Sequence, residues 1–359
     1  MTVITKTTTE QLHSVAADVA STFTWDYERS RPGLSKLYEK AKTSQWNVST
    51  DLDWSIDVDP ERVAMELGGG TNARFSVLRD LDDSPVRHFG DKEWLEVSVK
   101  MQNSLLSQFL HGEQGALLCT ARIVETVPWI DAKYYASTQV MDEARHVEVF
   151  ARYLHEKLSS QYRINDNLGS LLDDILADSR WDITYLGMQI MVEGLALAAF
   201  GMMHSITNEP LLKKLLRYVM SDEARHVAFG VLSLQELYSE LSDQEMRERQ
   251  EFAFDAACRL QRRFMQAEVW EQMGVDPKAV SDALDRANPP EQQMFQQLLF
   301  SKIVPNCKKL GLLDASGGWL RERFTEIGVI QFEDWVDTGE EYALLDEVAK
   351  DREAAAAAS

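Results

Sequence analysis

The sequence has few cysteines and no long hydrophobic run, and both shortages exclude classes of protein. Its three cysteines are Cys119, Cys258 and Cys307, and no two of them form a CxxC pair. Three scattered cysteines do not make a disulfide framework and are typical of a reducing compartment. Nowhere do eighteen apolar residues follow one another, and the first residues lack the apolar run of a signal peptide. We therefore expect a cytoplasmic protein without membrane insertion.

Positive charge is also scarce. The chain has 37 lysines and arginines against 58 aspartates and glutamates, which gives a net charge of −21. A chain this acidic is repelled by phosphate backbones, so we expect no nucleic-acid partner. Arg259, Arg262 and Arg263 form a local basic cluster. We expect it to be a solvated helix face, and docking of an acidic protein is the alternative.

What the sequence does have is one pentapeptide in two copies. Asp-Glu-Ala-Arg-His occurs at residues 142–146 and again at residues 222–226. On an α-helix, a glutamate and a histidine three residues later lie on one face, about one turn apart. Each copy therefore presents a pair of potential metal ligands in the same direction. A single Glu-x-x-His is usually only a solvated face, and a repeated one can also be purely structural.

Two isolated glutamates decide against these structural alternatives. Thirty residues before each Glu-x-x-His glutamate stands another glutamate, Glu113 or Glu193, within an apolar stretch of helical pattern. Burying such a carboxylate costs several kcal/mol unless it is paired or binds a metal. We therefore predict a dimetal site with six ligands, which are Glu113, Glu143, His146, Glu193, Glu223 and His226.

This ligand pattern carries a family resemblance. One glutamate from each of two helices and Glu-x-x-His from each of two others is the dimetal arrangement of ferritin-like bundles. Over roughly residues 94–241 the chain resembles the ferritin-like non-haem di-iron carboxylate superfamily. It is most similar in pattern to the oxygenases and desaturases related to the ribonucleotide reductase small subunit and to multicomponent monooxygenase large subunits. The resemblance implies two iron ions as cofactor, with a manganese–iron pair as the alternative.

The expected fold class is all-α, a ferritin-like four-helix bundle with additional flanking helices. We predict N-terminal helices and a connector over residues 1–90, the di-iron bundle over 91–241, and flanking helices with a tail over 242–359, in one compact domain overall. The pattern predicts helices over residues 9–23, 34–46, 92–126, 130–158, 168–177, 181–205, 211–241, 243–273, 277–287 and 291–312.

The residues beside the ligands predict a second layer of contacts. A histidine that binds a metal usually donates its other N–H group to a carboxylate. We expect Asp142 and Asp222 to accept from the histidine of the opposite copy, and Arg145 and Arg225 to neutralise these aspartates. Plain ion pairing between helices is the alternative role, and the two are compatible.

Several positions depart from the related families. Ribonucleotide reductase small subunits carry a radical-forming tyrosine where this chain has Phe150, and usually aspartate in place of Glu113. Multicomponent monooxygenases have threonine where this chain has Leu197. Aryl-amine N-oxygenases have a further histidine where this chain has Val219. These departures disfavour a tyrosyl radical and a seventh ligand.

The expected function is that of a di-iron monooxygenase. The resemblance implies O2 activation and hydroxylation of a small, apolar organic substrate, with electrons from a separate reductase or ferredoxin, in a homodimer. Acyl desaturation and N-oxygenation at the same site are alternatives, and a ferritin-like iron-storage protein is the alternative outside enzymes. Pocket candidates lie one turn from the ligands and are apolar, which also suits ordinary core: Ala116, Leu117, Phe150, Leu197, Phe200 and Phe229.

Overall fold

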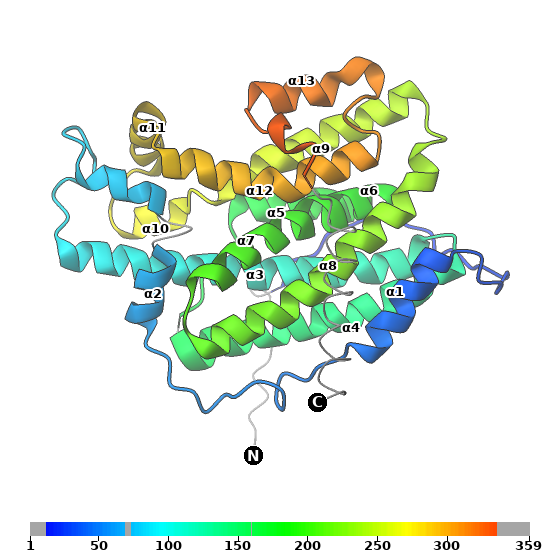
Figure 1. Cartoon of the computed structure of the whole chain (residues 1–359), viewed down its shortest axis with the longest axis horizontal. Coiled ribbons are helices and arrows are strands. Elements are labelled where there is room, and N and C mark those ends of the chain that lie inside the picture. The colour runs from blue at the N-terminus through cyan, green and yellow to red at the C-terminus, as the bar shows by residue number, and fades with distance from the viewer. Residues whose placement is uncertain (1–11, 69–72, 159, 336–359) are drawn as a thin grey trace, which may run out of the picture.

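The computed structural model describes residues 12–68, 73–158 and 160–335, and this part of the chain is helical without strands (Figure 1). Four long helical runs make the bundle. These are α3 (Asp91–Thr126), α4 (Ile130–Tyr153), the run formed by α6 (Trp181–Tyr185), the π-helical segment η4 (Leu186–Val192) and α7 (Glu193–Ile206), and α8 (Pro210–Tyr238). The predicted all-α, ferritin-like fold class is confirmed.

Local chemistry sets the ends of these helices. Before α3, the backbone N–H group of Gly90 donates to the side chain of Glu93 at 2.9 Å, which closes the first turn. The helix ends before Pro128, which has no N–H group to continue it. Before α8, the carboxylate of Glu209 accepts from the N–H groups of Leu211 and Leu212, at 2.8 and 2.6 Å.

The third run of the bundle is its most apolar. Within the described residues, Trp181–Ile206 is long and apolar enough to cross a membrane, but 89% of its apolar 18-residue window is buried inside the protein. Its middle, η4, is a π-helix, a form that often occurs at functional sites. The first α-helical residue after it is Glu193.

Flanking helices cover the bundle on two sides. The helices α9 (Asp243–Arg263), α12 (Pro290–Lys309) and α13 (Trp319–Glu326) lie over one side, while α1 (Pro32–Thr43) lies along the outer end of α4 and α8 (Figure 1). Three shorter helices complete this layer: α2 (Pro60–Gly68), α10 (Ala267–Gln272) and α11 (Pro277–Ala287). The helix α5 (Asp166–Ala177) packs between α3 and α9.

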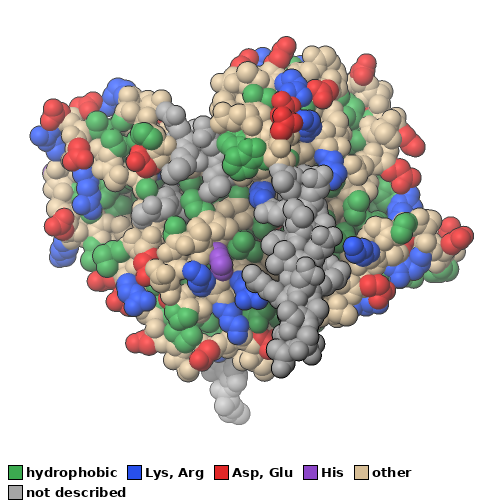
Figure 2. Space-filling model, in the orientation of Figure 1, with side chains coloured by type: hydrophobic (Ala, Val, Ile, Leu, Met, Phe, Trp, Pro, Cys, Tyr) green, Lys and Arg blue, Asp and Glu red, His purple; other side chains and the backbone are tan. Residues whose placement is uncertain are grey.

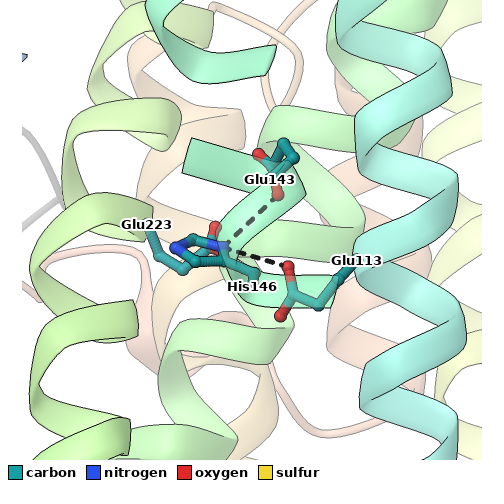
Figure 3. Close-up of side chains that lie close together, drawn as sticks. All are labelled: Glu113, Glu143, His146 and Glu223. Carbon is teal, nitrogen blue, oxygen red and sulfur yellow. Dashed lines mark hydrogen bonds and ion pairs between the residues drawn. The ribbon is translucent and has the colours of Figure 1, made fainter. Parts of the chain in front are cut away.

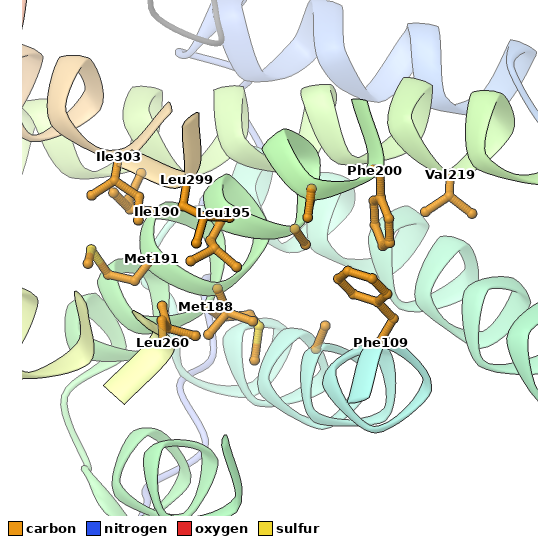
Figure 4. Packing of buried hydrophobic residues seen from close by; sticks show 14 of the residues in the cluster. Phe109, Met188, Ile190, Met191, Leu195, Phe200, Val219, Leu260, Leu299 and Ile303 are labelled. Carbon is orange, nitrogen blue, oxygen red and sulfur yellow. The ribbon is translucent and has the colours of Figure 1, made fainter. Parts of the chain in front are cut away.

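A continuous apolar core joins the bundle to these helices. Side chains of η4 and α7, among them Ile190 and Leu195, meet Leu299 and Ile303 of α12 (Figure 4). On the face shown in Figure 2, by contrast, acidic and basic side chains are interspersed. Burial of this apolar surface is the main force that holds the layers together.

The predicted helix over residues 9–23 is wrong for its described part. Residues 12–31 form no helix, and residues 9–11 lie outside the described part of the chain. The segment runs along the end of α3 instead, where the N–H group of Thr22 donates to the carbonyl oxygen of Glu125 at 2.9 Å. Leu12 and Phe23 are exposed and Val15 is only partly buried, so the apolar residues spaced for one helix face have little core surface to pack on.

The single helix predicted over residues 243–273 is also wrong. The chain turns after Arg263 and begins α10 only at Ala267, and Gln266 has a left-handed backbone with φ of 51°. Neither glycine nor proline stands between residues 260 and 273 to indicate this break. The predicted C-terminal tail beyond residue 335 lies outside the described residues.

Candidate metal centre

All six predicted ligands converge in the interior of the bundle. Glu113 comes from α3, Glu143 and His146 from α4, Glu193 from α7, and Glu223 and His226 from α8, and all are buried. They form two groups in which the donor atoms lie within 4.8 Å of one another. One group is Glu113, Glu143, His146 and Glu223 (Figure 3), and the other is Glu143, Glu193 and His226.

Two of the carboxylates lie between the two imidazoles. His146 Nδ1 is 3.4 Å from Glu143 Oε2 and 3.1 Å from Glu223 Oε1. His226 Nδ1 is 3.0 Å from Glu143 Oε1 and 3.4 Å from Glu223 Oε2. Each of these glutamates therefore directs one oxygen toward each histidine. A carboxylate in this position is suited to bridge two cations, one beside each imidazole.

The carboxylate oxygens also show that the cluster fits cations. Glu143 Oε2, Glu193 Oε2 and both oxygens of Glu223 are buried without a hydrogen-bond partner among the described residues. Buried charged oxygens without donors are costly unless a cation compensates them. The four carboxylates and two imidazoles are hard oxygen and nitrogen donors, which suit a pair of iron or manganese ions. The donor set therefore fits a dinuclear metal site.

Without cations, the cluster is stabilised by protons. Burial, with the neighbouring charge of Glu223, raises the pKa of Glu113 to about 8, and burial raises the pKa of Glu193 well above its usual range. Burial opposes ionisation of Glu143 too, but the imidazoles of His226 and His146 outweigh it and lower the pKa of Glu143. Burial likewise opposes protonation of both histidines, but the surrounding carboxylates raise their pKa values well above normal.

The outer nitrogen of each histidine faces an aspartate of the opposite copy. His146 Nε2 is 3.2 Å from Asp222 Oδ2, and His226 Nε2 is 3.3 Å from Asp142 Oδ2. Such a contact fixes the orientation of an imidazole and leaves its Nδ1 free to face a metal.

The two arginines tie these aspartates together. Arg145 pairs with Asp142 and lies 3.2 Å from Asp222, while Arg225 pairs with Asp222 and lies 3.4 Å from Asp142. Both guanidinium groups are buried. The quartet therefore balances its own charge and also joins α4 to α8, so neutralisation and interhelix pairing are served by the same contacts.

Three polar residues around the cluster were missed by the sequence analysis. Trp46 Nε1 donates to Asp222 Oδ2 at 2.8 Å, and Gln45 Nε2 donates to Asp142 Oδ1 at 3.3 Å. Gln139 Nε2 donates to Glu143 Oε1 at 3.0 Å and to Glu193 Oε1 at 2.9 Å. Gln139 stands one helical turn before Glu143, a spacing that could have identified it. No local signal links Trp46 or Gln45 to aspartates so distant in sequence.

A small cavity adjoins the cluster. Its free volume of about 10 Å³ has room for roughly one water molecule. An added Cβ at Gly112 would meet no atom within 4 Å, so the cavity wall is open there. The lining residues are Gln108, Phe109, Gly112, Glu113, Ala116, Val192, Glu193, Ala196, Glu223 and Arg263.

The predicted pocket residues lie in different places. Of the six, Ala116 lines this cavity. Phe150 and Phe200 pack behind Phe109, with ring centroids 6.2 and 4.5 Å from its ring. Phe229 packs against Tyr135 and Tyr185 instead. Leu117 is half-buried and Leu197 is buried, and neither lines the cavity.

The basic cluster is only partly a solvated face, so that prediction is wrong for one of its members. Arg262 is exposed, and Arg259 forms surface ion pairs with Asp174 and Asp255. Arg263 is 3% exposed and lines the cavity. The cause is that α9 packs one face onto η4, and the last residue of that face reaches the cluster.

A larger cavity lies away from the metal centre. It has a volume of about 1050 Å³ and is bordered by the N-terminal half of α3, residues 160–167 and α10. Its lining mixes acidic side chains with Lys92, Lys100 and Arg163. It includes none of the six candidate ligands, so we do not place the chemistry there.

Comparison with known proteins supports the fold. No protein-family model and no curated protein matches the chain. Among solved structures, a variant of an R2-like ligand-binding oxidase with an anaerobically reconstituted Mn/Fe cofactor is 19% identical, with a TM-score of 0.50 over 80% of this chain and 93% of the other. Another variant of that oxidase is 20% identical, with a TM-score of 0.48 over 80% and 95% of the two chains. The chain therefore has a ferritin-like helical fold with a buried carboxylate–histidine cluster that fits a dinuclear metal site.

Proposed function

We propose that this protein is a non-haem dimetal oxidase that uses O2 to oxidise a small organic substrate. The observation that carries the proposal is the position of Glu143 and Glu223, each of which faces both imidazoles within a buried cluster. The donor set favours two iron ions or a manganese–iron pair over structural zinc, which prefers thiolates. The R2-like oxidase of similar fold carries Mn/Fe, which agrees with this metal choice.

The ligand roles follow the geometry. We assign Glu113, Glu143 and His146 to one metal and Glu193, Glu223 and His226 to the other, with Glu143 and Glu223 as bridges. When bound, such a pair supplies electrons to O2.

The surrounding residues hold the site in place. Gln139 orients Glu143 and Glu193 through its amide, while Asp142 and Asp222 orient the imidazoles. Apolar side chains of the small cavity, such as Phe109 and Val192, exclude water from the reacting side.

Hydroxylation is the reaction we favour, with electrons from a separate reductase or ferredoxin. Desaturation and N-oxygenation use the same centre and remain the alternatives. Phe150 packs in the position of the radical-forming tyrosine of the related reductases and has no hydroxyl group to oxidise. Val219, one turn before Glu223, supplies no seventh ligand. Both features favour chemistry on a bound substrate over a stored radical.

Metal loading tests the proposal. The wild-type chain should bind two iron(II) ions under anaerobic conditions and change its optical spectrum when O2 is added. Glu143→Ala should lose both ions because its carboxylate belongs to both ligand groups. Glu148→Ala, on the exposed face of the same helix, is the matched control and should load normally. Stoichiometric iron in Glu143→Ala, with the helices intact by circular dichroism, would refute the assignment.

Product analysis and solution mass test the reaction class. Isotopically labelled O2 with a panel of small acids, amines and hydrocarbons should give a product that carries one labelled oxygen. An unlabelled alkene would indicate desaturation instead. A hollow shell of many copies that accumulates iron would support storage, whereas the predicted homodimer supports catalysis.

A further inference from the structure

Arg263 is a buried cation that has no ionic partner among the described residues. It ends α9, and among the described residues no hydrogen bond or ion pair reaches its guanidinium group, while Phe264 and Phe109 lie 4.8 and 5.7 Å from it. Burial lowers the pKa of Arg263 to about 10, and the charge of Glu113 opposes this shift only in part. A buried charge of this kind costs several kcal/mol, so its retention calls for a partner.

The guanidinium group faces the metal centre. Arg263 lines the same small cavity as three of the candidate ligands, Glu113, Glu193 and Glu223. None of these carboxylates lies within ion-pair distance of it in the described structure. Apart from Gln108, whose amide already bonds to the backbone of Arg163 and Asn165, the rest of the cavity wall is Gly112 and apolar side chains. The cavity therefore offers one cation, an apolar wall and an adjoining metal site.

Charge balance shows what this cavity lacks. The four glutamates balance two divalent cations, and Asp142 and Asp222 are balanced by Arg145 and Arg225. Arg263 therefore remains as a single uncompensated positive charge once the proposed metals are bound. A bound ligand with one negative charge would complete the balance. The planar fork of an arginine is best matched by a carboxylate, which it can bind through two parallel hydrogen bonds.

We propose that Arg263 binds the carboxylate of the substrate beside the metal pair, so that the substrate is a small organic acid. This inference rests on the proposed oxidase function, because it gives that site a substrate class. The free volume of about 10 Å³ holds roughly one water molecule, so a carboxylate enters by displacing that water and pushing apolar side chains of the wall aside. The substrate is thus either a short acid that displaces few of these side chains, or a longer acid whose chain displaces more of them.

Ligand binding without turnover tests the proposal. Calorimetric titrations use straight-chain monocarboxylates from formate to hexanoate, with the primary amides of the same lengths as neutral controls. The protein is titrated both metal-free and loaded anaerobically with manganese(II). The wild type should bind acids in preference to amides. The chain length that binds most tightly shows whether the natural substrate is a short or a longer acid. Equal binding of acids and amides would overturn the proposal.

Substitutions of Arg263 sharpen this test. Arg263→Met should weaken acid binding about 10- to 100-fold, the usual effect of a charge-assisted hydrogen-bonded pair. Arg263→Lys should retain part of the affinity, and Arg262→Met, on the exposed side of the same helix end, should retain all of it. Unchanged acid affinity in Arg263→Met, in both the metal-free and the manganese-loaded protein, would overturn the proposal.

Folding and metal content separate this proposal from a structural role and from the proposed function. Arg263→Met should keep two metals and melt at the same or a higher temperature, because it removes an unpartnered buried charge. A lower melting temperature with loss of metal would mean that Arg263 serves as a structural counter-ion, and would overturn the proposal. If the wild type and Arg263→Met both load two metals and neither protein binds acids, the inference about Arg263 fails while the proposed dimetal site stands.

The cavity itself has a separate test. Gly112→Ala adds a methyl group where no atom lies within 4 Å, so it should fill the free space without a clash. We expect weaker acid binding, unchanged metal loading and a slightly more stable helix. Unchanged acid binding in this variant would place the ligand elsewhere and overturn the proposed position.

Discussion

The two hairpins of the bundle supply the same candidate ligands but differ in what surrounds them. Glu113, Glu143 and His146 of the first recur as Glu193, Glu223 and His226 of the second, each eighty residues later. Glu193 accepts a hydrogen bond from Gln139 of the first hairpin, and no equivalent amide exists at Val219. The comparison teaches that a repeated set of candidate ligands does not imply a repeated environment.

The helices behind the ligands differ as well. One turn after the histidine, the first hairpin has Phe150 and the second has Gly230. The glycine lets α8 approach η4, because an added Cβ there would lie 2.6 Å from Gln189 Cβ. The phenylalanine instead fills space with Phe109 and Phe200. Equivalent positions therefore have opposite size requirements.

The largest expected effect comes from emptying the first of these positions. Phe150→Ala removes a fully buried ring from the stack with Phe109 and Phe200. We expect the free energy of unfolding to fall by about 3–5 kcal/mol in chemical denaturation. Phe254→Ala, at a half-buried ring, is the control and should cost less. Equal losses in both variants would show that the stack behind the centre is not tightly packed.

The next comparison concerns the two aspartates. Asp222 Oδ2 accepts from Trp46 at 2.8 Å and lies 3.2 Å from His146, whereas the contacts of Asp142 to Gln45 and His226 are 3.3 Å. We expect Asp222→Asn to weaken metal affinity about 100-fold and Asp142→Asn about 10-fold, measured by competition with a chelator. The exposed Asp243→Asn should change nothing. The reverse order would contradict the asymmetry.

Filling the small position of the second hairpin should have a smaller effect. Gly230→Ala forces Gln189 and Ile190 of η4 away from α8. We expect a loss of about 2 kcal/mol in the free energy of unfolding, together with reduced metal occupancy because η4 leads directly into Glu193. Gly112→Ala is the matched control, since its added Cβ meets no atom. Destabilisation by both substitutions would point to a general intolerance of alanine.

The smallest effect tests the anchoring of the two hairpins. The start of α8 is capped locally by Glu209, whereas Asp131 near the start of α4 accepts from Arg29 and Ser35, at 3.0 and 2.9 Å. Burial opposes ionisation of Asp131, but these hydrogen bonds outweigh it and lower its pKa. Asp131→Asn should cost about 1.5 kcal/mol at neutral pH.

This cost should depend on pH in one direction. A lowered folded-state pKa gives stability that is fully present above the unfolded value of about 3.9 and is lost as pH falls through the folded value. Denaturation curves of the wild type and Asp131→Asn should therefore converge below about pH 4. A constant difference across that range would show that the charge of Asp131 contributes nothing.

Local sequence patterns predicted the candidate ligands and the aspartates and arginines beside them, but not the contacts that come from distant segments. Glu-x-x-His places its two side chains on one helix face, so helical periodicity predicts each pair, and the two isolated glutamates with the family resemblance predict that the pairs meet. Trp46 and Asp222 are separated by 176 positions, and their contact depends on how α1 packs, which no local pattern states. A cluster of three arginines indicates a solvated face, whereas the burial of Arg263 depends on how α9 packs on η4.

The depth of the cluster has a consequence for how the protein acquires its ions. Each of the six donor residues is at most 5% exposed, so a hydrated cation would reach them only if the surrounding side chains or helices move. Uptake would then require a brief local opening of the bundle. The rate of metal loading at saturating ion concentration should therefore measure the rate of this opening.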